Sequence, residues 1–194
     1  MQVAAVILAA GASRRLGQPK QLLQLNGETL LARAVRIASE AGAEPVFAVL
    51  GAHAEEMQSA LATSSARILL NAEWQSGLAS SVRVGVLAVQ QHPPAADGVL
   101  LMNCDQPRLN AAHLRALLAA FAAQAGQGIA ASSYSGARGV PAIFPRALFG
   151  QLQQLTGDKG ARALLMQSAQ PVALVPFAGG DLDIDTPDDL AHLA

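Results

Sequence analysis

The chain has 194 residues, of which 52% are hydrophobic and 14% charged, so its composition predicts one domain, residues 1–194, with a large buried core. A formal net charge of −1 without any long run of lysine and arginine argues against a nucleic-acid-binding surface. No apolar run is long enough to cross a bilayer, and no positively charged leader precedes the first apolar run. A single cysteine excludes an internal disulfide. A cytoplasmic location is therefore expected.

Short apolar runs alternate along the chain with longer alanine- and leucine-rich stretches of helical period. This alternation predicts an α/β fold in which a mostly parallel sheet lies between two layers of helices. The expected strands cover residues 3–9, 45–50, 67–70, 99–103, 129–133 and 172–177. The expected helices cover residues 29–41, 55–62, 80–90, 111–125 and 162–167, and a last one follows Thr186.

The polar segment GASRRLGQPK, residues 11–20, directly follows the first expected strand. Its glycine permits close backbone approach, its N–H groups can point at oxygen anions, and its cationic side chains can neutralise charge. Lys20 is one of two lysines in the chain, and the other, Lys159, lies in a second polar turn, GDKGAR. The segment therefore predicts a polyphosphate site, whereas the alternative is a solvated basic turn.

Two familiar glycine loops do not fit this segment. A Walker loop needs Lys and then Ser or Thr after its second glycine, but Gln18 follows Gly17 here. The dinucleotide fingerprint needs a glycine where Ser13 stands, which removes the main support for an NAD or FAD enzyme.

Carboxylates at two distant points of the chain are candidate ligands of a hard cation. Asp105 follows the strand VLLMN, and Asp183 and Asp185 alternate in DLDIDTPDDL, where an extended backbone points both the same way. Mg²⁺ needs only one or two carboxylates when phosphate oxygens complete its coordination. The alternative is that Asp185 and Thr186 only cap the last helix.

Ligands of an open α/β sheet lie beyond the carboxyl ends of its strands, where Gly11, Asn71 and Asp105 are each expected. The segment SGARGVPAIFP, residues 135–145, breaks the alternation and predicts a loop and an edge strand that frame a substrate pocket. Together these features indicate Mg²⁺-assisted attack of an acceptor phosphate on the α-phosphate of a nucleoside triphosphate, with pyrophosphate as the leaving group.

Other reactive side chains are assigned structural roles. The four histidines are scattered without the paired spacing of a zinc site. Cys104 is expected to be a small buried hydrophobe and not a nucleophile, and Trp74 a packing residue and not a ligand contact.

Six motifs occur along the chain in an order that resembles the molybdenum cofactor nucleotidyltransferases, most closely their molybdopterin cytidylyltransferase-like branch. They are LAAGASRRLGQPKQLL, NAEWQSGLASSVRVG, CDQP, GVPAIF, GDKGAR and DIDTPDDL. The resemblance runs from Val3 to the last helix. It implies a three-layer, Rossmann-like nucleotide-binding fold of the nucleotide-diphospho-sugar transferase type, transfer of NMP from an NTP to a phosphate acceptor, and a Mg²⁺ requirement.

The resemblance also assigns roles by position. Arg15 would contact the triphosphate, and Lys20 would neutralise charge on the α-phosphate during attack. Asp105 would be the principal Mg²⁺ ligand and Asp185 the second, with Asp183 as the alternative.

Binding residues follow from the same motifs. The nucleotide would be bound by Leu8, Ala9, Ala10, Gly11, Ala12, Ser13, Arg15, Lys20, Gly77 and Ser81. The acceptor would be bound by Gly139, Pro141, Lys159 and Arg162.

The substrates are implied by the resemblance alone. The sequence LAAG is similar to that of the cytidylyl enzymes, which favours CTP, with a molybdopterin-type cofactor as acceptor and a molybdoenzyme as a possible partner. Two alternatives stay open. One is transfer to another small phosphate such as a sugar phosphate, and the other is a carrier that delivers a cofactor to a molybdoenzyme without turnover.

Overall fold

A computed structural model describes residues 1–168 and 170–193, and its centre is a sheet of seven strands in the order β5-β4-β1-β6-β8-β7-β9. All of its strand pairs are parallel except the two made by β8. The strands are β1 (Val3–Ala9), β4 (Val46–Leu50), β5 (Arg67–Leu70), β6 (Gly98–Asn103), β7 (Ile129–Tyr134), β8 (Ala137–Pro145) and β9 (Val172–Pro176). A separate hairpin is formed by β2 (Gln24–Leu25) and β3 (Glu28–Thr29).

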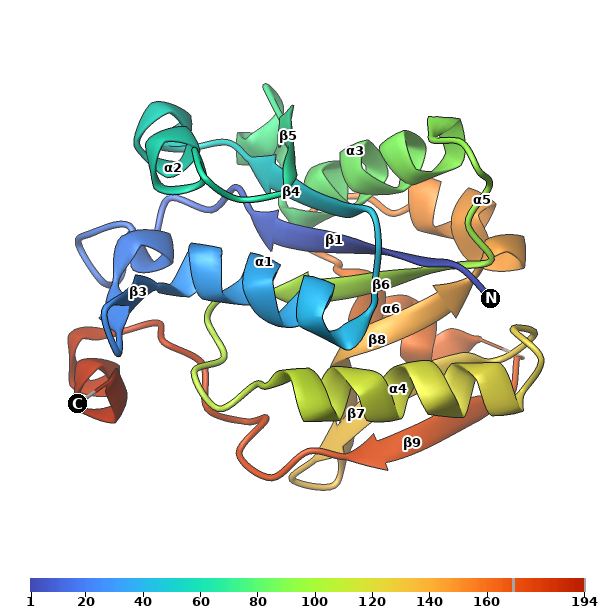
Figure 1. The fold of residues 1–194 in the computed structure, drawn as a ribbon. Helices are drawn as coiled ribbons and strands as arrows, with labels where there is room; N and C mark the ends of the chain where they lie inside the picture. The colour runs from blue at the N-terminus through green and yellow to red at the C-terminus, as the bar shows by residue number, and fades with distance from the viewer. Residues whose placement is uncertain (169, 194) are drawn as a thin grey trace.

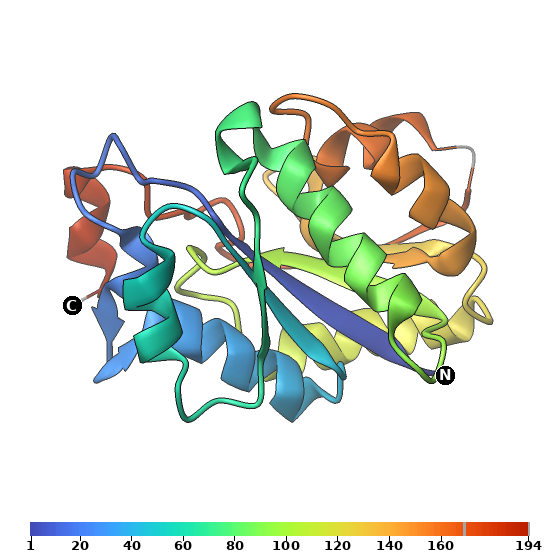
Figure 2. The same cartoon turned by 90° about the horizontal axis from the view of Figure 1, so that it is seen from above.

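Helices cover both faces of the sheet, with α1 and α4 on one face and α3, α5 and α6 on the other (Figures 1 and 2). The α-helices are α1 (Leu30–Ala41), α2 (Ala54–Ala60), α3 (Leu78–Gln91), α4 (Ala111–Ala123), α5 (Phe149–Gln153) and α6 (Ala161–Gln167). Short 3₁₀ turns are η1 (Lys20–Leu22), η2 (Trp74–Ser76), η3 (Arg146–Leu148) and η4 (Pro187–Leu193). In the described part of the chain, no helix combines the length and the apolar character needed to span a membrane.

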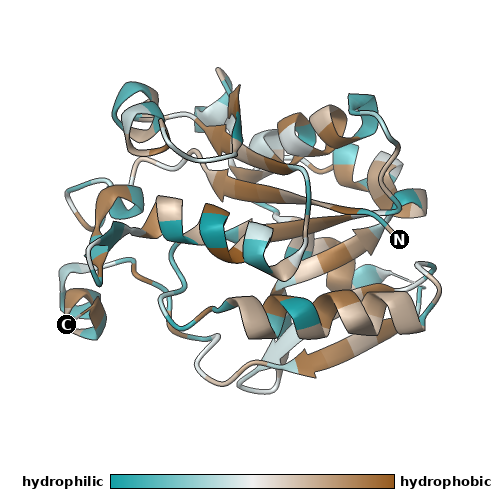
Figure 3. Cartoon of the chain, viewed as in Figure 1, coloured by the Kyte–Doolittle hydropathy of each residue, from teal (hydrophilic) through white to brown (hydrophobic). Residues whose placement is uncertain are grey.

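The central strand β1 explains why the sheet has a core on each face. Its residues are all buried, and successive side chains point to opposite faces. Ala5 and Ile7 pack with α1 and α4, whereas Val6 and Leu8 pack with α3 and α5. Figure 3 shows that the central strands are hydrophobic along their length, as expected for a parallel sheet that is covered on both sides.

The structure confirms the predicted α/β fold and places every expected strand within one residue of its predicted ends. Side chains cap two of the helices, because Thr29 and Asn110 accept backbone hydrogen bonds at the starts of α1 and α4. One expectation is wrong: β8 is not an edge strand but lies inside the sheet, antiparallel to both β6 and β7. Pro141 is tolerated there because it falls at the irregularity of register between β8 and β7, and Pro145 is the last residue of the strand.

Gly85 lets α3 pack closely on the central strand. A Cβ atom at this position would lie 2.3 Å from Cγ1 of Val6, a stiff β-branched side chain on β1. We therefore expect Gly85→Ala to lower the free energy of unfolding by about 1–3 kcal/mol, measured by urea denaturation. Gly150→Ala in α5 is the control, since nothing lies within 4 Å of its Cβ, and equal effects of the two substitutions would contradict this account.

Candidate active site

The basic segment after β1 is folded around one buried side chain, Gln21. Its amide Nε2 donates hydrogen bonds to the carbonyl oxygens of Ala9 at 3.0 Å and Gly11 at 2.7 Å. The Ser13 hydroxyl donates to Gln21 Oε1 and accepts from the Lys20 backbone N–H. These bonds fix the loop between the end of β1 and η1, and they place Lys20 at the carboxyl end of the sheet.

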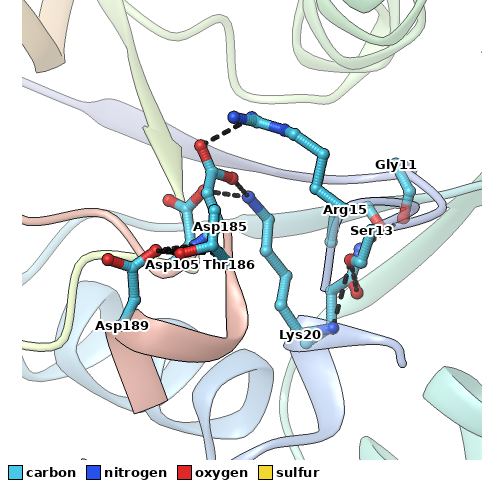
Figure 4. A network of polar contacts seen from close by, with 10 residues as sticks. Gly11, Ser13, Arg15, Lys20, Asp105, Asp185, Thr186 and Asp189 are labelled. Atoms are coloured by element: carbon cyan, nitrogen blue, oxygen red, sulfur yellow. Dashed lines mark hydrogen bonds and ion pairs between the residues drawn. The ribbon is translucent and has the colours of Figure 1, made fainter. Parts of the chain in front are cut away.

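The Lys20 ammonium joins two carboxylates that are far apart in the sequence. Its Nζ lies 2.5 Å from Asp105 Oδ2 and 2.7 Å from Asp185 Oδ1, and Nη2 of Arg15 lies 2.8 Å from Asp185 Oδ2 (Figure 4). Asp105 follows β6, the neighbour of β1, whereas Asp185 comes from the segment before η4. The structure thus brings the predicted catalytic and metal-binding side chains into one cluster.

Asp189 orients the segment that carries Asp185. Its Oδ2 accepts hydrogen bonds from the backbone N–H of Asp185 at 3.0 Å and from the N–H and hydroxyl of Thr186 at 2.7 and 2.8 Å. The alternative in which Asp185 only caps the last turn is wrong, because Asp189 accepts the capping bonds and the Asp185 carboxylate pairs with Lys20 and Arg15.

The cluster changes the pKa values of its members. Burial acts to lower the pKa of Lys20, but the charges and hydrogen bonds of Asp105 and Asp185 outweigh it, and the net pKa is raised. Burial, reinforced by the charge of Asp105, raises the pKa of the Asp183 carboxyl to about 6. The ammonium therefore stays charged at neutral pH, and negative charge is concentrated around it.

One oxygen of this cluster has no partner within the protein. Asp105 is 6% exposed, and its Oδ1 makes no hydrogen bond among the residues that the structure describes. A buried carboxylate oxygen is normally paired, so this atom fits a hard cation that is bound together with the substrate. Within the same residues, no three or more His, Cys, Asp and Glu side chains are grouped as a complete metal centre, and phosphate oxygens would have to complete the coordination.

A cavity of about 780 Å³ opens beside this cluster, at the carboxyl ends of β1 and β6. The predicted site residues in its wall are Leu8, Ala10, Gly11, Ala12, Ser13, Arg15, Lys20, Gly77, Ser81, Asp105 and Asp185. Asp183, the alternative ligand, and Trp74 also line it, so Trp74 is a wall residue of the cavity. Ala9 is not in the wall, and its contribution is the carbonyl that holds Gln21.

The predicted acceptor-binding residues are not brought into this cavity. Gly139 and Pro141 belong to β8, Lys159 and Arg162 are exposed, and none of the four is in the described cavity wall. Their neighbour Asp158 is in the wall. The role of these four residues in acceptor binding stays a prediction.

Sequence reasoning missed several residues of this site. Gln21 could have been found from its place directly after Lys20, at the end of the basic segment of residues 11–20, but no pattern marks a glutamine as buried. Cys104, by contrast, is confirmed as buried, and burial together with the charge of Asp105 raises the pKa of its thiol to about 12. Further wall residues that were not predicted are Arg14, Gln75, Leu78, Asn103 and Asp158.

Comparison with known proteins gives a family match over most of the chain. The family described as MobA-like NTP transferase domain matches residues 5–172. Purine catabolism protein PucB of Bacillus subtilis is 35% identical over 95% of this chain and 92% of its own length. Nicotine blue oxidoreductase of Paenarthrobacter nicotinovorans is 31% identical over 98% of this chain and 96% of its own length. A probable molybdenum cofactor guanylyltransferase of Synechococcus elongatus is 40% identical over 60% of this chain and 57% of its own length.

The fold is shared with a solved structure over the full length of the chain. The crystal structure of Rv0371c from Mycobacterium tuberculosis superposes with a TM-score of 0.84 and 36% identity, covering 100% of this chain and 97% of that one. The crystal structure of an Rv0371c complex with manganese superposes with a TM-score of 0.78 and 32% identity, covering 100% of this chain and 98% of that one. The shared length includes every segment that forms the cavity.

Proposed function

Because the chain belongs to the family of MobA-like NTP transferase domains, we propose that this nucleotidyltransferase moves CMP from CTP to the phosphate of a molybdopterin-type cofactor and releases pyrophosphate. The observation that carries the proposal is the Lys20 ammonium held between two carboxylates in the wall of the cavity. This arrangement supplies a fixed positive charge where the charge of a triphosphate would have to be neutralised.

The basic loop is the proposed binding site of the triphosphate. The backbone around Gly11 has open space, since nothing lies within 4 Å of a Cβ built there, and phosphate oxygens can approach it closely. Arg15, whose side chain is 72% exposed at the cavity, can turn its guanidinium from Asp185 to the phosphates. Guanidinium groups bind phosphate through two parallel hydrogen bonds, which also fixes the orientation of the triphosphate.

The proposed chemical step needs alignment and charge stabilisation. An oxygen of the acceptor phosphate attacks the α-phosphorus, the bond from that phosphorus to the bridging oxygen breaks, and the electron pair leaves with pyrophosphate. Lys20 stabilises the negative charge that develops on the α-phosphate oxygens. A bound Mg²⁺, held by Asp105 and Asp185, would supply Lewis-acid stabilisation of the phosphates. The unpaired Asp105 oxygen and the manganese complex of the M. tuberculosis relative support a divalent cation.

A second candidate uses GTP in place of CTP. It is favoured by the 40% identity to the probable molybdenum cofactor guanylyltransferase, which covers 60% of this chain. The two candidates share the loop, the cation and the leaving group, and differ only in the base.

Turnover with each of the four nucleoside triphosphates tests both candidates. Purified protein, MgCl₂ and molybdenum cofactor are mixed with one NTP at a time, and pyrophosphate release is measured. We expect release that requires the cofactor and is fastest with CTP. Fastest release with GTP would support the second candidate, and no release with any NTP would contradict nucleotidyl transfer to this cofactor.

A further inference from the structure

A buried polar network centred on Asn71 lies behind the wall of the cavity, and the proposed chemistry gives Asn71 no role. Asn71 follows β5 and is 3% exposed, and it contacts two adjacent serines at the start of α3, Ser80 and Ser81. Its Nδ2 lies 2.8 Å from Ser80 Oγ and 3.0 Å from Ser81 Oγ. Ser81 lines the cavity, whereas Ser80 is not in its wall and lines a second, smaller hollow.

The orientation of the Asn71 amide is fixed by the backbone. Its Oδ1 accepts a hydrogen bond from the N–H of Glu73 at 2.9 Å, and a backbone N–H can only donate. The oxygen of the amide must therefore face Glu73, and the NH₂ group must face the serines. Both amide hydrogens are then used as donors to hydroxyl oxygens.

This orientation decides what the Ser81 hydroxyl can do. Its oxygen accepts from Asn71, and among residues 1–168 and 170–193 its proton has no hydrogen-bond acceptor. The carbonyl oxygen of Gly77, one turn earlier, already accepts from the N–H of Ser80 at 3.1 Å and from the hydroxyl of Ser80 at 2.8 Å. With both lone pairs of that carbonyl in use, the free proton of Ser81 is available to the cavity.

We infer that Asn71 is a positioning residue for base recognition, which holds the Ser81 hydroxyl as a hydrogen-bond donor toward the base of the bound nucleotide. The inference rests on the proposed function, because it takes Ser81 and Gly77, which both line the cavity, to lie beside the base of the bound nucleotide. A donating hydroxyl needs a hydrogen-bond acceptor opposite it, so the site favours a base edge with a ring nitrogen or a carbonyl oxygen at that position. It disfavours a base edge with an amino group there. Asn71 itself does not touch the nucleotide.

The only tryptophan in the chain, Trp74, lies in the cavity wall and provides a binding signal that is independent of turnover. Its fluorescence is titrated with the favoured NTP and, separately, with inorganic tripolyphosphate, both with MgCl₂. Tripolyphosphate carries the phosphates without a base, so it separates base recognition from loss of the folded site. The proteins are the wild type, Asn71→Ala, Ser81→Ala, Ser80→Ala and the double variant Asn71→Ala/Ser81→Ala.

We expect Asn71→Ala and Ser81→Ala each to weaken NTP binding about tenfold, the effect of one neutral hydrogen bond. Tripolyphosphate binding should not change, KM for the NTP should rise in parallel, and kcat should be kept. The double variant should bind the NTP no more weakly than Ser81→Ala alone, because Asn71 acts through that hydroxyl. Ser80→Ala, which removes the other contact of Asn71, should bind the NTP like the wild type.

Three results would overturn the inference. The first is that Asn71→Ala weakens tripolyphosphate binding as much as it weakens NTP binding. The others are that the double variant binds the NTP more weakly than Ser81→Ala does, or that Ser80→Ala weakens NTP binding as much as Ser81→Ala does. If Asn71→Ala does not fold, Asn71→Asp replaces it, since it keeps the size and the bond to Glu73 but removes the donors. The comparison of NTP binding by Ser81→Ala and by Ser80→Ala tests the role of the Ser81 hydroxyl without any change at Asn71. Wild-type protein that binds neither ligand would instead contradict the proposed function.

Discussion

Replacement of Lys20 by alanine is expected to lower the rate of pyrophosphate release by about 10³-fold, the upper end of the effect of one preorganised charge-stabilising donor. Asp105→Ala should cause a loss of similar size, because it removes the carboxylate that holds Lys20 at 2.5 Å and the proposed principal ligand of the cation. The measurement is kcat/KM with the favoured NTP and saturating MgCl₂.

Arg36 provides the control for this experiment. It is an exposed cation on α1 that pairs with Glu28 and Glu40 at 2.8 and 2.9 Å, outside the cavity wall. Arg36→Ala should retain wild-type turnover. Normal turnover in Lys20→Ala or Asp105→Ala would contradict the assigned site, provided that the far-UV circular dichroism of the variant matches that of the wild type.

Lys20→Met is expected to destabilise the metal-free protein by about 3 kcal/mol, the lower end of the cost of breaking a buried ion pair. The Lys20 and Asp105 side chains are only 19% and 9% exposed, so the substitution leaves a poorly solvated carboxylate without its cation. A divalent cation can replace the ammonium between Asp105 and Asp185. MnCl₂ should therefore raise the melting temperature of Lys20→Met by more than that of the wild type, in which the ammonium competes with the metal.

Thermal denaturation in EDTA and in MnCl₂ measures both parts of this prediction. Arg36→Met is the matched control, because its ion pairs are on the surface and contribute about 0–1 kcal/mol. It should melt close to the wild type and respond to manganese in the same way. A metal response that is the same in Lys20→Met and in the wild type would show that the ammonium does not occupy the place of a cation.

The sheet was largely predictable because its strands are buried on both faces. A run such as residues 3–9 has no polar face, so its hydrophobicity gives its length and its place in the interior directly. The position of β8 was not predictable, since proline and glycine in residues 135–145 are typical of an edge strand. Its pairing with β6 depends on tertiary contacts that a local sequence pattern does not show, because the segment from residue 104 to residue 136 separates the two strands.

The site was predictable where charge and strand ends coincide. Lys20, Asp105 and Asp185 each stand out against a chain in which 14% of residues are charged, and parallel strands bring their carboxyl ends to one edge. Gln21 and Asn71 were different, because a buried amide is defined by its hydrogen-bond partners and those partners are scattered over distant segments. The sequence showed Asn71 at the correct edge but not the serines that it contacts.

The ion pair between Arg15 and Asp185 spans 170 residues of sequence, and Lys20 reaches the same carboxylate over 165. During synthesis on a ribosome, the basic segment of residues 11–20 and Asp105 emerge long before Asp185 does. A nascent chain that ends near residue 180 contains every strand of the sheet but only one of the two carboxylates that hold the Lys20 ammonium. Translation must therefore pass residue 185 before the cluster can close, so an incompletely synthesised chain cannot assemble the site.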